Sequence, residues 1–224
     1  MPRDRFQHEL DEVEALIQDE GRLCRSSLDQ VMLALQSGNG QRARAVISAD
    51  DEVDALYLRV ETNVESLLAR QSPVAIDLRL VLAMIHINQH LERIGDQCVN
   101  IAKLLLLLDG SPFAPELAGE FAVMGNQAGA MIQQAMEAFG ARDVARAEQL
   151  VQMDQVINTA HHGLARKIQQ VEHNGADPEL GLRAIVIGRC LERIGDNAVD
   201  IGERTAYLVT AEFREFTDAS HRVS

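Results

Sequence analysis

The six residues Leu-Glu-Arg-Ile-Gly-Asp occur twice in this chain of 224 residues, at 91–96 and again at 191–196. Around each copy, mostly apolar residues follow an alternating spacing of four and three, the period of a helix packed lengthwise against other helices. The two series are Ile87, Leu91, Ile94, Cys98, Ile101, Leu105, Leu108 and Ile187, Leu191, Ile194, Ala198, Ile201, Thr205, Leu208. Neither shows the strict alternation of a β-strand, so the repeat predicts an all-α fold.

Proline and glycine positions divide the chain into six helical segments. Proline is tolerated in the first turn of a helix but not in its interior, and each of the five prolines stands where a helix could begin. With the polar and glycine-containing breaks, they predict helices at 4–36, 41–70, 74–108, 114–139, 143–173 and 178–210. Trp is absent and aromatic residues make up 4% of the chain. The core is therefore built from aliphatic side chains, which suits packed helices.

The duplication extends beyond the repeated hexapeptide. Residues 28–35 align with 132–139, and 46–50 align with 150–154, at an offset of 104, whereas the hexapeptides lie 100 residues apart. The second copy is therefore shorter by about one helical turn. A repeat of three helices can form a bundle. The sequence predicts two tandem three-helix bundles, 1–110 and 111–224, joined near 109–115.

Each repeat carries a stripe of oxygen-bearing side chains opposite the apolar seam of its last helix. The preceding helix carries two more at a spacing of four, and antiparallel packing would place Asp50 and Glu92 at a similar height. The candidate metal-ligating residues are Asp50, Asp54, Glu92, Asp96 and Asn100 in the first repeat, and Asp154, Asn158, Glu192, Asp196 and Asp200 in the second. This arrangement predicts one acidic groove per repeat, between the last helix and the helix before it.

Clustered carboxylates need a cation, because like charges four residues apart destabilise a helix by roughly 0.2–0.5 kcal/mol per pair. Carboxylate and amide oxygens suit hard ions such as Mg, Mn, Ca or iron. The alternative is neutralisation by arginine: Arg93 and Arg193 are adjacent to the acidic residues, and Arg59, Arg79 or Arg189 could arrive from neighbouring helices. That alternative leaves a metal-free helical adaptor as a second interpretation.

Two histidine pairs lie close to these stripes, and neither has a counterpart in the other repeat. His86 and His90 point away from Glu92 on the helical wheel. His161 and His162 follow Asp154 by about two turns, so one of them could add a nitrogen ligand. We expect both pairs to be surface or interhelix histidines. Gly95 and Gly195 flank the seam and are expected to allow a neighbouring helix to approach closely.

Composition and motifs argue against several classes of protein. A net charge of −13 repels nucleic acid and anionic membranes. The charged residues 1–12 include no signal-peptide core, and the leucine run 104–108 is far below the ~20 residues of a membrane span. The three cysteines are widely spaced, as expected for reduced thiols in the cytoplasm. A di-iron enzyme would carry inward Glu-x-x-His motifs, and this sequence has none.

The duplicated motif, with acidic residues in each preceding helix, resembles the PhoU family of phosphate-signalling regulators. Two further matches are the 77–80 run Asp-Leu-Arg-Leu after Gln-Ser-Pro at 71–73, and the Val-Asp pair at 53–54. The resemblance extends from about Phe6 to Val209. It implies two similar three-helix bundles that assemble as a homodimer.

The resemblance also implies multinuclear metal clusters, with iron foremost and Mg, Mn, Zn or Ni as alternatives, bound through E/DxxxD motifs. In this sequence the motifs fall on Glu92 with Asp96 and on Glu192 with Asp196. The repeats differ in two places: Asn100 stands opposite Asp200, and Asn158 stands opposite Asp54. We therefore expect the two sites to differ in metal count or affinity.

By the same resemblance, the chain is expected to be a cytoplasmic, non-enzymatic negative regulator of the phosphate-starvation response. Its partners would be the ATPase of a phosphate ABC transporter and a sensor histidine kinase of a two-component system. It would limit phosphate uptake and would reach the membrane through these partners only.

Overall fold

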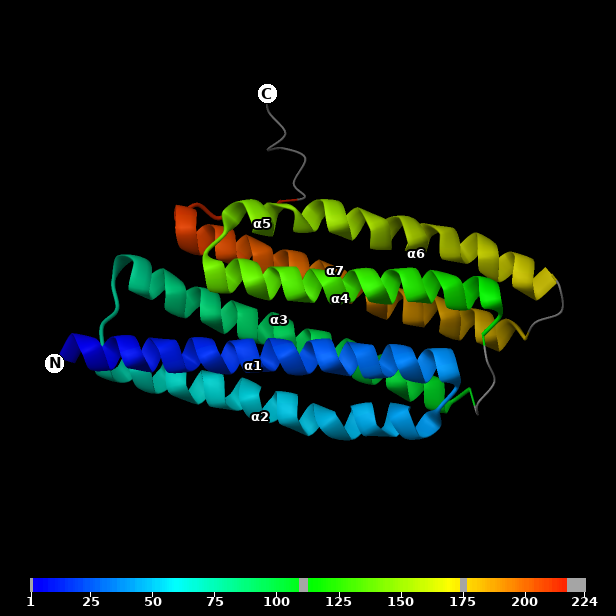
Figure 1. The fold of residues 1–224 in the computed structure, drawn as a ribbon, viewed down its shortest axis with the longest axis horizontal. Helices are drawn as coiled ribbons and strands as arrows, with labels where there is room; N and C mark the ends of the chain where they lie inside the picture. The colour runs from blue at the N-terminus through cyan, green and yellow to red at the C-terminus, as the bar shows by residue number, and fades with distance from the viewer. Residues whose placement is uncertain (1, 109–112, 174–176, 217–224) are drawn as a thin grey trace, which may run out of the picture.

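The computed structural model describes residues 2–108, 113–173 and 177–216, and its long helices lie nearly parallel in two layers (Figure 1). One half contains α1 (Pro2–Ser37), α2 (Gly40–Arg70) and α3 (Ala75–Leu106). The other contains α4 (Pro115–Ala141), α5 (Val144–Glu148), α6 (Leu150–His173) and α7 (Pro178–Thr210). The described residues contain no strand, so the predicted all-α architecture of two three-helix repeats is confirmed. The division into repeats 1–110 and 111–224 stays a prediction, and part of the predicted junction, 109–112, lies outside the described residues.

Helix ends are set by local signals that the sequence displays. The Asn39 side chain caps α2 by accepting hydrogen bonds from the amides of Gln41 and Arg42, at 2.9 and 3.2 Å. Such a cap satisfies amides that have no partner inside the helix. Pro115 and Pro178 stand at the first positions of α4 and α7. The observed ends therefore fall close to the predicted ones.

The fifth predicted helix, 143–173, is wrong in one respect, because the structure divides it into α5 and α6 at Gln149. The short helix α5 packs against α7. A Cβ on Gly202 would lie 3.2 Å from the carbonyl oxygen of Ala147 and 2.7 Å from Cδ1 of Leu150. The glycine allows this close approach, and the chain bends where the short helix meets α7.

α3 and α7 cross antiparallel and join the two halves. Three contacts give the register, and in them residue numbers rise along α3 as they fall along α7. Arg79 Nε donates to the Leu208 carbonyl at 3.2 Å, His90 Nδ1 lies 2.9 Å from Asn197 Oδ1, and Arg183 donates to the Leu107 carbonyl. This register places Ile94 level with Ile194, so the two copies of the repeated motif meet at the centre of the molecule. The halves are thus related by an approximate two-fold axis.

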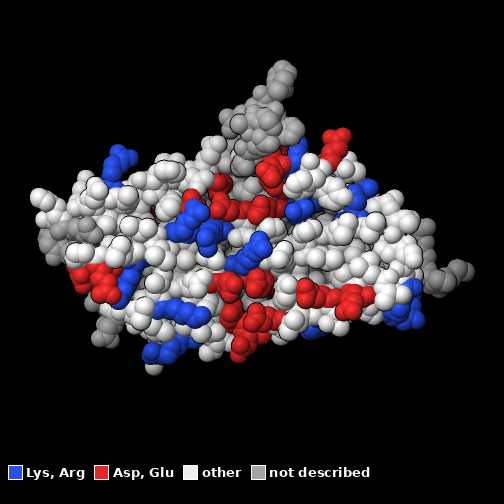
Figure 2. All heavy atoms as spheres, turned by 180° about the vertical axis from the view of Figure 1, so that it is seen from behind, with Lys and Arg blue, Asp and Glu red and all other residues white. Residues whose placement is uncertain are grey.

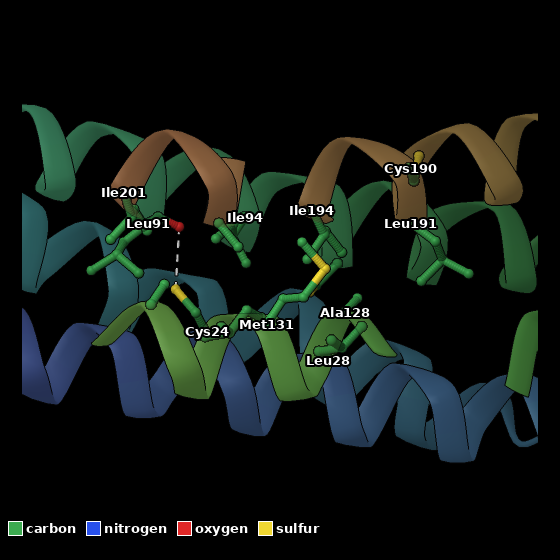
Figure 3. Close-up of a cluster of buried hydrophobic side chains, with 14 of the residues drawn as sticks. Cys24, Leu28, Leu91, Ile94, Ala128, Met131, Cys190, Leu191, Ile194 and Ile201 are labelled. Carbon is green, nitrogen blue, oxygen red and sulfur yellow. Dashed lines mark hydrogen bonds between the residues drawn. The ribbon is translucent and has the colours of Figure 1, made fainter. Parts of the chain in front are cut away.

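A continuous aliphatic core fills the space between the helices (Figure 3). Leu91, Ile94, Leu191 and Ile194 are fully buried in it. The thiol of Cys24 donates a hydrogen bond of 3.2 Å to the carbonyl of Leu91, which ties α1 to α3. No helix in the described residues has the length and apolar character needed to cross a bilayer.

Candidate functional site

The acidic stripes lie on the face opposite α1 and α4. Figure 2 shows two groups of acidic side chains there, separated by a band of basic ones. In the first half, the register of α2 and α3 is given by two contacts. A Cβ on Gly95 would lie 3.4 Å from Asp50 Oδ1, and Asn88 Nδ2 donates to the Tyr57 carbonyl at 3.2 Å. Asp50 is therefore level with the turn of Asp96, and Asp54 is level with Glu92.

The first acidic cluster consists of four carboxylates, Asp50, Asp54, Glu92 and Asp96. Within the described part of the chain, none of them makes a hydrogen bond or an ion pair. Partial burial, followed by repulsion from Asp96 and Asp54, raises the pKa of Glu92. Partial burial, followed by repulsion from Asp54 and Asp96, raises the pKa of Asp50. The cluster therefore concentrates negative charge that a bound cation would stabilise.

The fifth predicted residue of this half, Asn100, is exposed one turn beyond Asp96. Of the arginines considered as neutralising partners, Arg93 is the one that lowers the pKa of Glu92. Its effect is smaller than that of burial, Asp96 and Asp54, and larger than that of Asp50. Lys103 acts on Asp50 in the same direction. Arg79 instead donates to the Leu208 carbonyl, so it holds α3 against α7.

The second acidic cluster, Asp154, Asn158, Glu192 and Asp196, has partners inside the protein. Asn158 Nδ2 donates to Asp154 Oδ2 at 2.6 Å. Arg189, one turn earlier on α7, forms an ion pair with Oε2 of Glu192, and His161 Nδ1 lies 3.5 Å from its Oε1. Only Asp196 makes no hydrogen bond or ion pair in the described residues. The two halves therefore present the same scaffold with different charge.

Asp154 is the buried member of the second acidic cluster. It is 6% exposed, and its Oδ1 is buried without a hydrogen-bond partner. A Cβ on Gly195 would lie 2.8 Å from this oxygen and 2.9 Å from Cδ1 of Ile157. The prediction that a motif glycine allows a close helix approach is confirmed at Gly195, whereas a Cβ on Gly95 would lie 3.4 Å from Asp50 Oδ1, an ordinary contact. In both repeats, the group that approaches the glycine is a candidate ligand.

Burial of the second cluster also affects Asp196. Desolvation, followed by repulsion from Asp154 and Glu192, raises the pKa of Asp196 to about 6. Desolvation likewise raises the pKa of Asp154, although its hydrogen bond from Asn158 acts in the opposite direction. Within 2–108, 113–173 and 177–216, no three His, Cys, Asp or Glu side chains are already gathered closely enough to hold an ion. Binding would therefore require rotamer changes of the exposed carboxylates.

Asp200, the last residue of the second stripe, lies at the interface between the halves. Its Oδ2 is 3.4 Å from Nδ1 of His90, which also contacts Asn197. His90 is buried, as expected of an interhelix histidine, whereas Asp200 remains partly exposed. Sequence periodicity could not foresee this pair, because it forms only where α3 crosses α7. Asp200 is thus turned in part toward α3.

Sequence reasoning missed Glu20. It is fully buried, and neither carboxylate oxygen has a hydrogen-bond partner. Burial, followed by repulsion from Glu92, raises the pKa of Glu20 to about 9. A signal was present in the sequence, because Glu20 continues the apolar seam of α1 at the spacing set by Leu10, Val13, Ile17, Cys24, Leu28, Val31 and Leu35.

Comparison with known families agrees with this geometry. A family model described as the PhoU domain matches residues 17–105 and again 121–205, once in each half. The chain belongs to the PhoU family. Each match covers one bundle of the repeat, including its acidic motif. The PhoU resemblance expected from the sequence is thereby confirmed.

Two relatives show how far the similarity to PhoU extends. The phosphate-specific transport system accessory protein PhoU homolog 1 of Thermotoga maritima is 31% identical over 196 residues, covering 87% of this chain and 84% of the relative. A PhoU homolog from a Burkholderia species is 31% identical over 223 residues, covering 96% of this chain and 91% of the relative. The match therefore spans nearly the whole length of each protein.

Solved PhoU structures share the fold. The phosphate transport system regulatory protein PhoU from Streptococcus pneumoniae superimposes with a TM-score of 0.86 at 28% identity, covering 93% of this chain and 99% of that one. PhoU from Pseudomonas aeruginosa superimposes with the same TM-score and the same identity, covering 92% of this chain and 100% of that one. The six long helices and their pseudo-two-fold arrangement are thus those of PhoU proteins.

Proposed function

We propose that this PhoU protein is an accessory regulator of phosphate transport that limits phosphate uptake and represses the phosphate-starvation response. Membership of the family supports the role, since the relatives are named as accessory proteins of phosphate-specific transport. We propose that it works in the cytoplasm without enzymatic activity, as an adaptor between the ATPase of a phosphate ABC transporter and a sensor histidine kinase. We also propose that the protein forms a homodimer.

The charge of the acidic face supports such contacts. The net charge of −13 and the two acidic groups of Figure 2 favour a partner surface rich in Lys and Arg. Complementary charge accelerates encounter and is screened by salt. The adaptor would therefore hold its partners in part through electrostatic attraction.

Deletion of the gene in its source organism tests this role. Cells lacking the protein are expected to express phosphatase at high phosphate, and the intact gene should restore repression. Tagged protein from the restored strain should retain the transporter ATPase at low salt and release it at high salt. Normal repression in the deletion strain would contradict the regulatory role, and retention unaffected by salt would contradict the electrostatic contact.

We further propose that the acidic clusters bind metal, with iron foremost and Mg, Mn, Zn or Ni as alternatives. The observation that carries this is the first cluster, in which four neighbouring carboxylates lack any hydrogen bond or ion pair in the described residues. The unpaired, buried Oδ1 of Asp154 supports it in the second half. A bound cation would supply positive charge that offsets the repulsion. The residues Asp50, Asp54, Glu92 and Asp96, and Asp154, Glu192 and Asp196, would hold it.

Neutralising the motif carboxylates tests metal binding. The variant Glu92→Gln, Asp96→Asn, Glu192→Gln, Asp196→Asn should lose most bound iron or Mn²⁺, measured by elemental analysis after dialysis, and its melting temperature should stop responding to added metal. Without metal it should be more stable than the wild type, because each repelling pair costs roughly 0.2–0.5 kcal/mol.

The matched control is Asp11→Asn with Glu12→Gln, two exposed carboxylates of α1 away from the clusters. It should behave like the wild type. Equal metal content and equal metal response in the four-site variant and the wild type would leave the metal-free adaptor as the correct interpretation.

A further inference from the structure

The approximate two-fold axis emerges on the acidic face between two arginines. Arg93 of α3 and Arg193 of α7 occupy the same position of the repeated motif, and the register of the two helices places them at the same level. Both side chains are exposed, and neither forms an ion pair within the described residues. Figure 2 shows basic side chains in this band, between the two acidic groups. The centre of the face is therefore positive and its two flanks are negative.

Exposed leucines lie toward both ends of the same face. Leu82, near the start of α3, is 38% exposed, and its counterpart Leu182, near the start of α7, is 65% exposed. Each leucine precedes the motif arginine of its own helix by about three turns and lies within about 20° of it on the helical wheel. The leucines therefore face the same way as Arg93 and Arg193.

Neighbouring side chains extend each leucine into an apolar end patch. At one end, the exposed Val186 follows Leu182 by one turn, and a contact between the start of α7 and the end of α3 brings the exposed Leu107 alongside. At the other end, the exposed Leu78 precedes Leu82 by one turn. Exposed aliphatic side chains gathered in this way mark interaction sites. Core packing does not explain them, because they lie in solvent.

The register of α3 and α7 gives the separation of the two end patches. Leu182 is level with the turn of Leu105, so it lies about 35 Å from Leu82 along the helices. A strip of this length and two helices wide is comparable with the about 800 Å² that each partner contributes to a specific protein interface. The strip presents equivalent leucines and equivalent arginines on either side of one axis. Such an arrangement matches a partner that has two-fold symmetry.

A second copy of this chain does not fit this face. Arg93 and Arg193 lie nearest the axis, so two copies stacked face to face on that axis bring the same arginines together at any rotation. Like charges placed opposite each other oppose association. The homodimer proposed above would therefore use another surface. The complementary partner carries acidic residues at its own two-fold axis, basic residues beside them, and apolar residues farther out.

We propose that the exposed face of α3 and α7 is a docking surface for a two-fold symmetric protein dimer, so that one chain contacts both subunits of its partner. Two-fold dimers are the commonest oligomers of soluble proteins, and the two ATPase subunits of an ABC transporter form such a pair. This inference rests on the proposed adaptor function and makes it more specific. It assigns this surface to the paired ATPase subunits, with each subunit seated on one end patch.

Crosslinking to the intact phosphate transporter of the source organism, held in lipid nanodiscs, tests the assignment. The photoreactive p-benzoylphenylalanine replaces Leu82, Leu182 or both in the full chain. Each single position should crosslink to the same segment of the ATPase sequence, identified by mass spectrometry. The doubly labelled chain should give a product of one chain with two ATPase subunits on a denaturing gel. Position 33 is the control and should give neither product, because Leu33 is 44% exposed on α1, on the opposite face.

Affinity for the same nanodiscs provides a second measurement. Leu82→Ser and Leu182→Ser should each weaken binding about tenfold and by similar factors, because the two end patches are equivalent. The pair Arg93→Gln with Arg193→Gln should slow association, and most strongly at low salt. Leu33→Ser is the matched control and should bind like the wild type. All these side chains are exposed, so the variants are expected to keep the fold.

The outcomes separate this inference from the adaptor function on which it rests. The symmetric docking surface would be overturned, and the adaptor function left intact, if positions 82 and 182 reached different ATPase segments or the largest product held one ATPase subunit. Unchanged affinity in both leucine variants, or crosslinks from these positions to a second copy of the chain, would also overturn it. Failure of the wild type to bind the transporter at low salt would overturn the adaptor function as well.

Discussion

Replacing Glu20 by Gln is expected to remove a strong pH dependence from the stability of the protein. Glu20 is fully buried with both oxygens unpaired, and burial and the nearby Glu92 raise its pKa from 4.5 to about 9. The folded chain thus keeps the proton over a range in which the unfolded chain releases it. Folding takes up a proton there, so stability falls as pH rises from about 4.5 toward 9.

The size of this pH effect follows from the difference between the pKa of Glu20 in the folded and in the unfolded chain. Each pH unit between the unfolded and folded pKa costs about 1.4 kcal/mol, so at pH 7 this group lowers the unfolding free energy by about 3 kcal/mol relative to its value below pH 4.5. Gln has nearly the same shape and no charge. Urea denaturation at intervals from pH 5.5 to 8 should show Glu20→Gln gaining stability over the wild type, and the gain should increase with pH.

An exposed glutamate of α2 provides the control. Glu52→Gln should give a curve parallel to that of the wild type, because Glu52 lies in solvent. Parallel curves for Glu20→Gln and the wild type would show that Glu20 is not protonated in the folded protein. Such a result would contradict the raised pKa of Glu20.

Truncation of Ile194 is expected to be the most destabilising single change at the centre of the molecule. Ile194 is fully buried, and the register of α3 and α7 places it level with Ile94 where the halves cross. Ile194→Ala should lower the unfolding free energy by about 2–5 kcal/mol through lost burial and the cavity left behind. Ile194→Val should cost only about 0.5–1.5 kcal/mol. Chemical denaturation followed by circular dichroism measures both.

The pseudo-two-fold axis adds a second expectation, that Ile94→Ala resembles Ile194→Ala in cost. Leu182→Ala is the control on the same helix, since Leu182 is 65% exposed and its loss should change stability by less than about 0.5 kcal/mol. A cost below about 1 kcal/mol for Ile194→Ala would mean that the crossing of α3 and α7 is not a close-packed core.

Most of the fold could be predicted because helices and their ends are encoded locally. The four-three spacing through Leu91 and Leu191 indicated packed helices, and the prolines at 115 and 178 marked helix starts. The bend at Gln149 could not be predicted. It depends on contact between α5 and Gly202 of α7, which lies more than fifty residues away.

The candidate site was predictable in part, for the same reason. Helical spacing grouped Glu92 with Asp96 and Glu192 with Asp196, and the match between repeats pointed to their partners in the preceding helices. The neutralisation of the second cluster was not predictable as a whole. Arg189 was considered as a residue arriving from a neighbouring helix, but it pairs with Glu192 from one turn earlier on the same helix.

The sequence by itself determined that this chain forms helices, repeats itself and carries an acidic stripe in each repeat, because periodicity and caps act over a few residues. Only the tertiary structure decided which acids are buried and which meet a partner on another helix. Burial of Asp154 and Glu20, and the contact of Asp200 with His90, depend on how separate helices cross. The spacing within one helix carries no information on what a facing helix brings to it.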